Sequence, residues 1–272
     1  MTMKPKYLAI PYVGWMALFV VTPIILVFVF AFTTPEGELT LRNFSDMGLF
    51  SPVFIRSFRL AFIATIICIL LGYPVAYILA REVARVQRIL FMLIMLPLWM
   101  NFLLRTYAWM SILENTGLLN QLLSFLSLPT VSIINTEGAV VLGMVYNFLP
   151  FMILPIYSVI VKIDKSLLEA ASDLGANSFS VFRKLIIPLS IPGILSGVTM
   201  VFVPAVSAFV ITQLLGGGMV FLLGDLIEMQ FRGNAHNPHV GSAISLVMML
   251  IVIVFVIVMN KFGAGDAKAV RI

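Results

Sequence analysis

A polar stretch interrupts a sequence that is otherwise almost continuously apolar, and its residues are suited to docking on another protein. In SLLEAASDLGANSFSVFRK, Glu169 stands beside Ala170 and Ala171, with Gly175 four residues further on. Small side chains leave a low helical surface that fits a groove, and the carboxylate can pair with a basic group there. The pattern favours helix-in-groove docking and, equally, an amphipathic connector lying on lipid headgroups.

The same stretch predicts two short helices within 162–184. Ser166 and Glu169 have the spacing of a capping box, in which each side chain satisfies a free amide of the first turn. Gly175 suits the left-handed position that ends a helix. Asn177 or Ser178 is then expected to cap a second helix.

Several kinds of chemistry are disfavoured by what the sequence lacks. Two histidines and one cysteine, Cys68, exclude a disulfide framework and argue against a metal centre. No GxxxxGK[ST] loop is present, so the chain is not expected to hydrolyse ATP itself. No Ser/His/Asp set, HExxH motif or paired carboxylates occur in an apolar run. We therefore expect no catalytic residue, no metal and no cofactor on this chain.

The elements that must position these residues are membrane helices. The chain has 272 residues, of which 61% are hydrophobic and only 11% charged, a balance typical of integral membrane proteins. Runs of about 20 apolar residues cross a bilayer as helices, because lipid offers no hydrogen-bond partners to the backbone N–H and C=O groups. Six runs qualify: 7–32, 60–80, 89–104, 138–161, 185–215 and 241–259.

The distribution of basic residues predicts the orientation. Twelve of the 17 Lys and Arg residues fall on the side of the membrane that holds both termini and 162–184, which is therefore expected to be cytoplasmic. The basic balance then reports topology and does not indicate nucleic-acid binding. We expect one transmembrane domain, 1–272, with larger outer segments at 107–136, where GLLNQLLSFLSL suits a surface helix, and at 216–238.

Polar residues inside apolar spans are candidates for a transport pathway, because burying them unsatisfied is costly. Pro150, Pro155 and Pro204 add backbone carbonyls freed from the helical ladder. For Asn101 and Asn147 taken singly, hydrogen bonds between helices are the better explanation, whereas the group as a whole favours a pathway. The candidates are Asn101, Tyr146, Asn147, Thr212 and Gln213.

The polar stretch resembles the cytoplasmic loop motif of ABC-importer permeases. That motif is Glu-Ala-Ala, three residues, Gly, nine residues, then aliphatic-x-aliphatic-Pro, and it maps onto Glu169, Gly175 and Pro188. Leu185 and Ile187 stand where Ile and Leu are more usual. Further segments, GYPVAY, LPLWMNFLLRTYAW, VYNFLPFMILPIYS and PLSIPGI, extend the similarity over about 15–262, and they are similar to the B permease subunit of spermidine/putrescine importers.

This resemblance implies an all-α integral membrane fold, the six-helix type I (MetI-like) permease, in a bacterial inner or plasma membrane. The implied partners are a second, related permease, two copies of a cytoplasmic ATPase that uses ATP and Mg²⁺, an extracytoplasmic binding protein and membrane lipid. The two short helices become coupling helices seated on the ATPase, and the pore between the permeases works by alternating access. The implied coupling residues are Glu169, Ala170, Ala171, Gly175, Arg183 and Pro188.

A polyamine substrate implies recognition by carboxylates and by aromatic rings that contact ammonium groups. Asp225 and Glu228 are three apart and would share one face of a helix. The acids have another explanation, which is that the outer side merely avoids positive charge. The tryptophans have one too, as members of the aromatic belt at the membrane interface. The further candidates are Glu114, Glu137, Trp99, Tyr107 and Trp109.

Two other functions stay open. Sister permeases for other small solutes share much of the pattern, so the transporter class follows more firmly than its substrate. A secondary transporter driven by an ion gradient commonly has buried acids in the middle of the membrane, and no acid here falls in the middle of a span.

Overall fold

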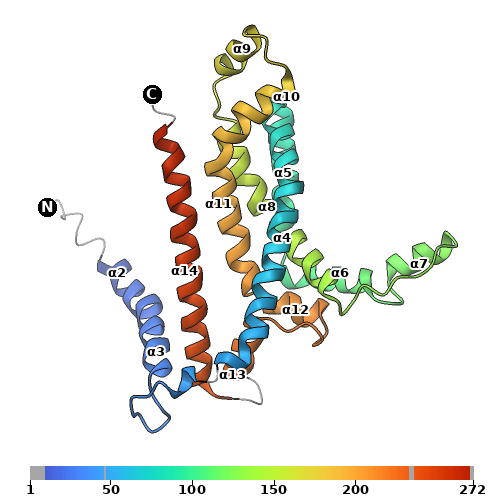
Figure 1. Cartoon of the computed structure of the whole chain (residues 1–272). Coiled ribbons are helices and arrows are strands. Elements are labelled where there is room, and N and C mark those ends of the chain that lie inside the picture. The colour runs from blue at the N-terminus through green and yellow to red at the C-terminus, as the bar shows by residue number, and fades with distance from the viewer. Residues whose placement is uncertain (1–9, 46, 233–235, 270–272) are drawn as a thin grey trace. The chain divides into compact units, whose positions relative to one another are not determined.

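The structure, a computed structural model of the chain, describes residues 10–45, 47–232 and 236–269, and only the backbone of 10, 165, 172 and 263–269. Lys4, Lys6 and Arg271, which count among the twelve basic residues used to predict the orientation, lie outside the described residues. Helices make up the described part, with one isolated β-bridge between Thr33 and Leu39, so the all-α prediction is confirmed. Figure 1 shows α2 (Ile10–Met16), the π-helix η1 (Ala17–Val21), α3 (Thr22–Ala31), the 3₁₀-helix η2 (Arg42–Phe44), α4 (Met47–Arg81), α5 (Ala84–Trp99), α6 (Phe102–Leu113), α7 (Leu118–Phe125), α8 (Glu137–Ile160), α9 (Lys165–Asp173), α10 (Ser178–Val181), the π-helix η3 (Phe182–Ile186), α11 (Ile187–Val206), α12 (Phe209–Leu215), α13 (Leu223–Arg232) and α14 (Pro238–Ala269).

Five continuous helical stretches in the described residues are long and apolar enough to cross a membrane: 11–31, 47–81, 137–160, 178–206 and 238–262. A sixth crossing exists if the bent pair formed by 84–99 and 102–125 counts as one. The stretch predicted at 60–80 is the apolar part of α4, a helix of 35 residues that begins at Met47. Arg56 and Arg59, expected in a loop, therefore lie on this helix.

The run predicted as one span at 89–104 breaks at Trp99. Met100 has an extended backbone, with ψ of 149°, and Asn101 caps the next helix with a hydrogen bond from the Leu103 amide to Oδ1, 2.8 Å. The chain bends by 90° there, so α6 and α7 leave the bundle sideways. Hydropathy does not detect this break because Phe102, Leu103 and Leu104 continue the apolar run.

The long run predicted at 185–215 also divides. α11 ends at Val206, two residues after Pro204, and α12 starts at Phe209. A proline removes one ladder hydrogen bond and crowds the preceding turn, which favours a helix end nearby. The expected helical surface segment GLLNQLLSFLSL does form a helix, α7.

The chain falls into two compact units, and we describe each by itself. The first holds the described residues of 1–52 and 226–253, and its buried cluster joins Ala31 of α3 to Ala243 and Leu246 of α14. In the same unit, His239 Nδ1 lies 3.1 Å from the Phe30 carbonyl oxygen. The second unit holds 53–225 with the described residues after 253, and it contains both candidate sites below.

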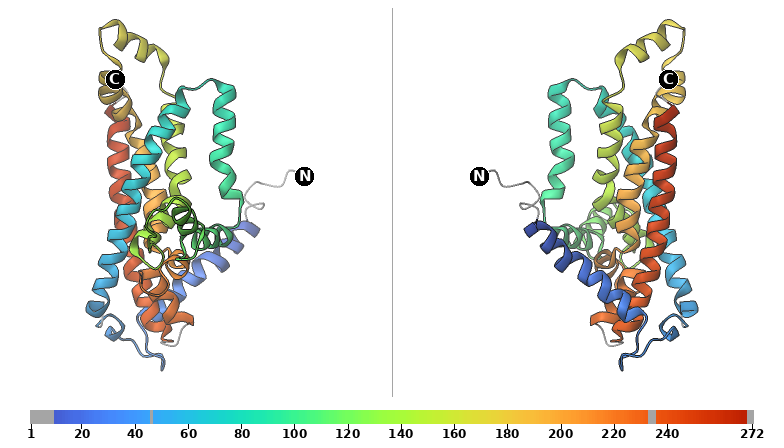
Figure 2. Two further views of the ribbon diagram at one scale, coloured as in Figure 1. Left: turned by 90° about the vertical axis from the view of Figure 1, so that its right-hand side faces the viewer. Right: turned by 90° about the vertical axis from the view of Figure 1, so that its left-hand side faces the viewer.

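The core of the second unit is built on close packing of α8 against α11, with α4 alongside (Figures 1 and 2). Gly193 and Gly197, four apart on α11, face α8 so closely that an added Cβ would lie 2.8 Å from the Pro155 carbonyl oxygen or 2.7 Å from Met152 Sδ. Small residues at this spacing let membrane helices approach and gain van der Waals contact. The three helices therefore form one tightly packed body.

Candidate functional site: a helix pair and a polar cluster

The α9 helix lies beyond the main body of the second unit, at one end (Figures 1 and 2). Its start corrects the predicted capping box, because Asp164 Oδ1 accepts the Ser166 amide at 3.0 Å and Ser166 itself lies inside the first turn. Hydrogen bonds from the Ser166 amide and hydroxyl lower the pKa of the Asp164 carboxyl. An aspartate one residue before the helix satisfies a free amide without help from Glu169, whose carboxylate stays available.

The end of α9 is as predicted. Gly175 has φ of +80°, the left-handed region, and the Ala176 amide donates to the Ala171 carbonyl oxygen at 3.1 Å. This is the six-to-one bond of a Schellman motif, which a residue with a Cβ supports poorly. The sharp turn lets a second short helix follow at once.

The surface of α9 is open. Glu169 and Ala170 are exposed, and Leu174 at the helix end is 89% exposed. The carboxylate, the small alanine and the leucine are therefore all accessible to another protein. Ala171 is partly buried.

The second helix is fixed to the body of the unit on its other side. Asn177 caps α10 as predicted, its Oδ1 accepting the Ser180 amide at 2.8 Å, and Phe179 is 67% exposed. Phe182 of η3 meets the rings of Tyr73 and Tyr77 edge-on, with centroids 5.8 and 4.9 Å away. These contacts join the helix pair to the end of α4. The candidate coupling residues Arg183 and Pro188 are exposed.

A polar cluster lies at the opposite end of the second unit, around α12 and the start of α13 (Figure 1). Asp225 is buried, and its Oδ2 accepts the Thr212 hydroxyl at 2.6 Å and the Leu222 amide at 2.9 Å. Ser57 Oγ of α4 accepts the next amide, Leu223, at 2.8 Å. The predicted candidates Thr212 and Asp225 are therefore brought together, and the cluster satisfies two free amides of α13.

Glu137 is already occupied by two arginines. Its carboxylate lies 3.2 Å from Arg56 Nε and 2.6 Å from Arg59 Nη2, which joins α4 to the start of α8. A carboxylate in the first turn also interacts favourably with the helix dipole. Glu137 is therefore a structural residue here, whereas sequence reasoning treated it as one of several acids for a cation.

The remaining candidates are scattered. Trp109 of α6 packs edge-on against Tyr146 of α8, with ring centroids 5.3 Å apart. Asn147 is buried, and its amide donates to the Gly143 carbonyl oxygen of its own helix at 2.9 Å. The structure places Asn101 as a helix cap, leaves Trp99, Tyr107, Gln213 and Glu114 exposed, and puts Glu228, half-buried, in the other compact unit.

Sequence reasoning missed several polar residues that the structure makes prominent. Arg105 of α6 is buried, and its Nε and Nη1 have no hydrogen-bond partner among the described residues. The Asn147 Oδ1 atom is in the same condition. Arg105 stands in an apolar run and was counted as an outside charge. The spacing of Arg56 and Arg59, three residues apart on one helical face, was a usable signal for a shared partner.

The arrangement of the helices is shared with a solved bacterial transporter. The structure superimposes on a bacterial ABC transporter involved in the import of the acidic polysaccharide alginate with a TM-score of 0.76, covering 95% of this chain and 94% of the other at 18% identity. At that identity the likeness concerns the fold.

The chain belongs to the family of binding-protein-dependent transport system inner membrane components, which it matches over residues 72–264. It is 40% identical over 256 residues to the spermidine/putrescine transport system permease protein PotB of Haemophilus influenzae, covering 89% of each chain. It is 38% identical over 249 residues to PotB of Escherichia coli K12, covering 88% of this chain and 90% of that protein. The chain is thus a permease subunit, and ATP hydrolysis belongs to a separate ATPase subunit.

Proposed function

We propose that this chain forms half of the translocation pore of an ATP-driven importer of polyamines, with spermidine or putrescine as substrate. The observation that carries this proposal is the similarity to the two PotB proteins over almost the whole chain. Those relatives are named for this transport.

The proposed assembly contains a second, related permease, two copies of an ATPase and an external binding protein. The family description supports dependence on a binding protein. The predicted orientation then puts both termini, α9 and α10 in the cytoplasm. The polar cluster at Thr212 and Asp225 faces the opposite side, toward the binding protein.

In this assembly α9 and α10 are the segment that the ATPase moves. The exposed Glu169 and Ala170, with Leu174 and Phe179, supply a carboxylate, a low surface and two apolar side chains for a groove. Motion of the pair would pass directly into α11, which continues from η3, and into α8, which packs on α11 through Gly193 and Gly197. Rigid-body displacement of packed helices is a common way to open and close a site.

For the substrate path we propose the polar residues of α8 and α12. Asp225 now accepts the Thr212 hydroxyl, and an ammonium group is a donor that can replace it. The Asn147 Oδ1 atom, buried and without a partner among the described residues, is a second acceptor, and the preceding residue, Tyr146, contacts the Trp109 ring. The exposed Trp99, Tyr107 and Gln213, together with Glu228 and Asn101, remain candidates for the outer part of the path.

The coupling role is tested in the assembled importer with Glu169→Lys and Gly175→Asp. We expect both variants to reach the membrane but to lose the stimulation of ATP hydrolysis by polyamine-loaded binding protein. Gly175→Asn is the matched control, since it has the same shape without the charge and tolerates the left-handed backbone. Normal assembly and normal stimulation in both charged variants would contradict the proposal.

A further inference from the structure

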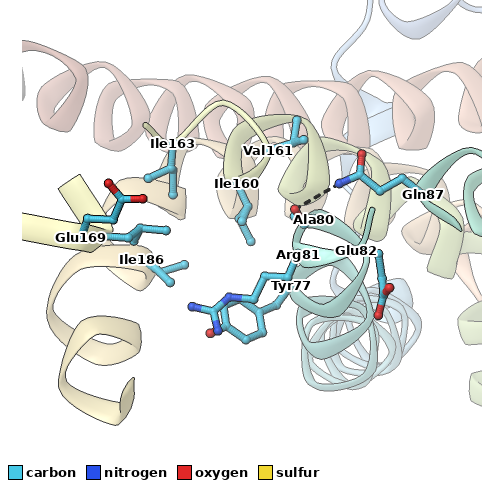
Figure 3. A pocket seen from close by; sticks show the side chains of 11 residues that line it. Tyr77, Ala80, Arg81, Glu82, Gln87, Ile160, Val161, Ile163, Glu169 and Ile186 are labelled. Carbon is cyan, nitrogen blue, oxygen red and sulfur yellow. Dashed lines mark hydrogen bonds between the residues drawn. The ribbon is translucent and has the colours of Figure 1, made fainter. Parts of the chain in front are cut away.

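A pocket of about 360 Å³ separates α9 from the body of the second unit. Its walls come from the end of α4, the start of α5, the end of α8, α9 and η3 (Figure 3). The floor is largely apolar and includes Ile160, Ile163 and Ile186. Among the described helices, α9 has its most extensive contact with α10, and the pocket leaves open space between α9 and the end of α4.

Two opposite charges from different helices line this pocket. Arg81 is the last residue of α4, and Glu169 lies in the middle of α9. The ion pairs formed among the described side chains join Arg56 and Arg59 to Glu137, and none of them joins Arg81 to Glu169 across the pocket. A third charge, Glu82, lines the pocket on the side away from Glu169 (Figure 3).

The position of Arg81 is set by a stack of rings. Its guanidinium carbon lies 4.5 Å from the centre of the Tyr77 ring, and that ring meets Phe182 of η3 at 4.9 Å. The planar guanidinium is suited to such stacking, and it keeps its hydrogen-bond donors free at the edge. The stack therefore places a positive charge on the wall of the pocket and links α4 to η3, which follows α10.

We propose that Arg81 is a positioning residue for Glu169: the two form an ion pair when the pocket closes, in the state in which the carboxylate is not paired with a basic group of the ATPase groove. The proposal rests on the coupling role given above to α9. A pair enclosed by isoleucine walls is less screened than one in open solvent, which favours closure. Since Arg81 belongs to α4, the pair would make α4 a third helix, with α8 and α11, that follows the ATPase.

The test measures stimulation of ATP hydrolysis by loaded binding protein in the assembled importer. Arg81→Gln should reduce stimulation about two- to fivefold, the effect expected for a partly exposed ion pair. Arg81→Lys keeps the charge and should retain more of the stimulation. Arg85→Gln removes an exposed arginine of α5 that does not line the pocket, and it should leave stimulation unchanged.

A double variant separates positioning from a merely structural role. If Arg81 acts through Glu169, then Arg81→Gln should have no further effect once Glu169→Gln is present. Equal and additive losses would overturn the inference. If Glu169→Gln lowers stimulation but Arg81→Gln behaves like Arg85→Gln, this inference fails and the coupling role stands. If Glu169→Gln has no effect, the coupling role itself fails.

Crosslinking supplies a measurement that does not depend on activity. Arg81→Cys with Glu169→Cys, in a Cys68→Ala background, should be joined by a bifunctional thiol crosslinker of about the length of an Arg–Glu pair in one nucleotide state of the importer and not in the other. Arg85→Cys with Glu169→Cys is the matched pair. Absence of the Arg81–Glu169 crosslink in every nucleotide state would overturn the proposed closure.

Discussion

At the scale of single residues, Asp164 sets the start of the helix that we assign to coupling. Its carboxylate accepts hydrogen bonds from Ser166, which lowers its pKa in the folded protein. A lowered pKa means that the stabilisation is complete above the carboxyl's unfolded pKa and disappears as pH falls through the lower folded value. Around neutral pH the cap is therefore always ionised.

This gives a prediction about α9. Asp164→Ala should speed amide hydrogen exchange in the first turn of α9 at neutral pH, while Asp164→Asn, also a good cap, should do so less. In the unmodified protein, the rate of amide exchange in the first turn of α9, once corrected for its intrinsic pH dependence, should rise only at acidic pH. Asp173→Ala, at the opposite end of the helix, is the control. Identical exchange in the Asp164 variants and the parent would show that the cap is unimportant.

A second residue-scale prediction concerns Glu137. Glu137→Gln leaves Arg56 and Arg59 without their shared carboxylate, so the free energy of unfolding should fall. The groups are 37–54% exposed, so each pair contributes at most about 1 kcal/mol. Unfolding in denaturing detergent, measured for Glu137→Gln, Arg59→Gln and the double variant, gives the coupling energy. A coupling energy of zero would mean that the Arg59–Glu137 ion pair does not stabilise the fold.

At the scale of elements, the packing of α8 on α11 carries the motion proposed for transport. Gly193→Val should break this packing, because its Cβ would meet the Pro155 carbonyl oxygen at 2.8 Å. Overpacking of this kind costs about 1–3 kcal/mol. Gly14→Val is the control, because nothing lies within 4 Å of a Cβ there. A detergent-unfolding measurement should find only Gly193→Val destabilised, and equal stability of both variants would rule out close packing at Gly193.

Much of this element-scale picture follows from local signals in the sequence. Apolar runs locate the long helices, and Gly175 and Asn177 mark an end and a start that the structure confirms. The break at Trp99 is different, since Asn101 caps a helix inside an unbroken apolar run. Hydropathy measures transfer to lipid and not backbone direction, so the 90° bend escapes it.

The candidate site residues also fall into those that the sequence could predict and those that it could not. Glu169 and Gly175 belong to a contiguous motif, so their arrangement could be predicted. Thr212 and Asp225 meet only because the chain turns back after α12, and Ser57 joins them from another helix. Such contacts between distant segments depend on tertiary packing, which a single sequence does not specify. The Gly193 and Gly197 spacing was available as a signal for close helix packing and was overlooked.

At the scale of the whole molecule, the chain is a permease subunit whose energy comes from a separate ATPase subunit. The family and the fold assign this chain to an importer in which a separate ATPase subunit hydrolyses ATP. The proposed polar path through α8 and α12 and the proposed coupling helices lie at opposite ends of one packed unit. That separation requires the motion of helices, and not chemistry on this chain, to connect ATP hydrolysis with transport.

The substrate claim is tested most directly by uptake of labelled spermidine and putrescine. Proteoliposomes would hold this chain with the second permease and the ATPase, with ATP inside and the binding protein outside. Accumulation of either polyamine that requires both ATP and the binding protein is the predicted result, and Glu169→Lys should abolish it. An assembled complex that hydrolyses ATP but moves neither polyamine would contradict the proposed substrate.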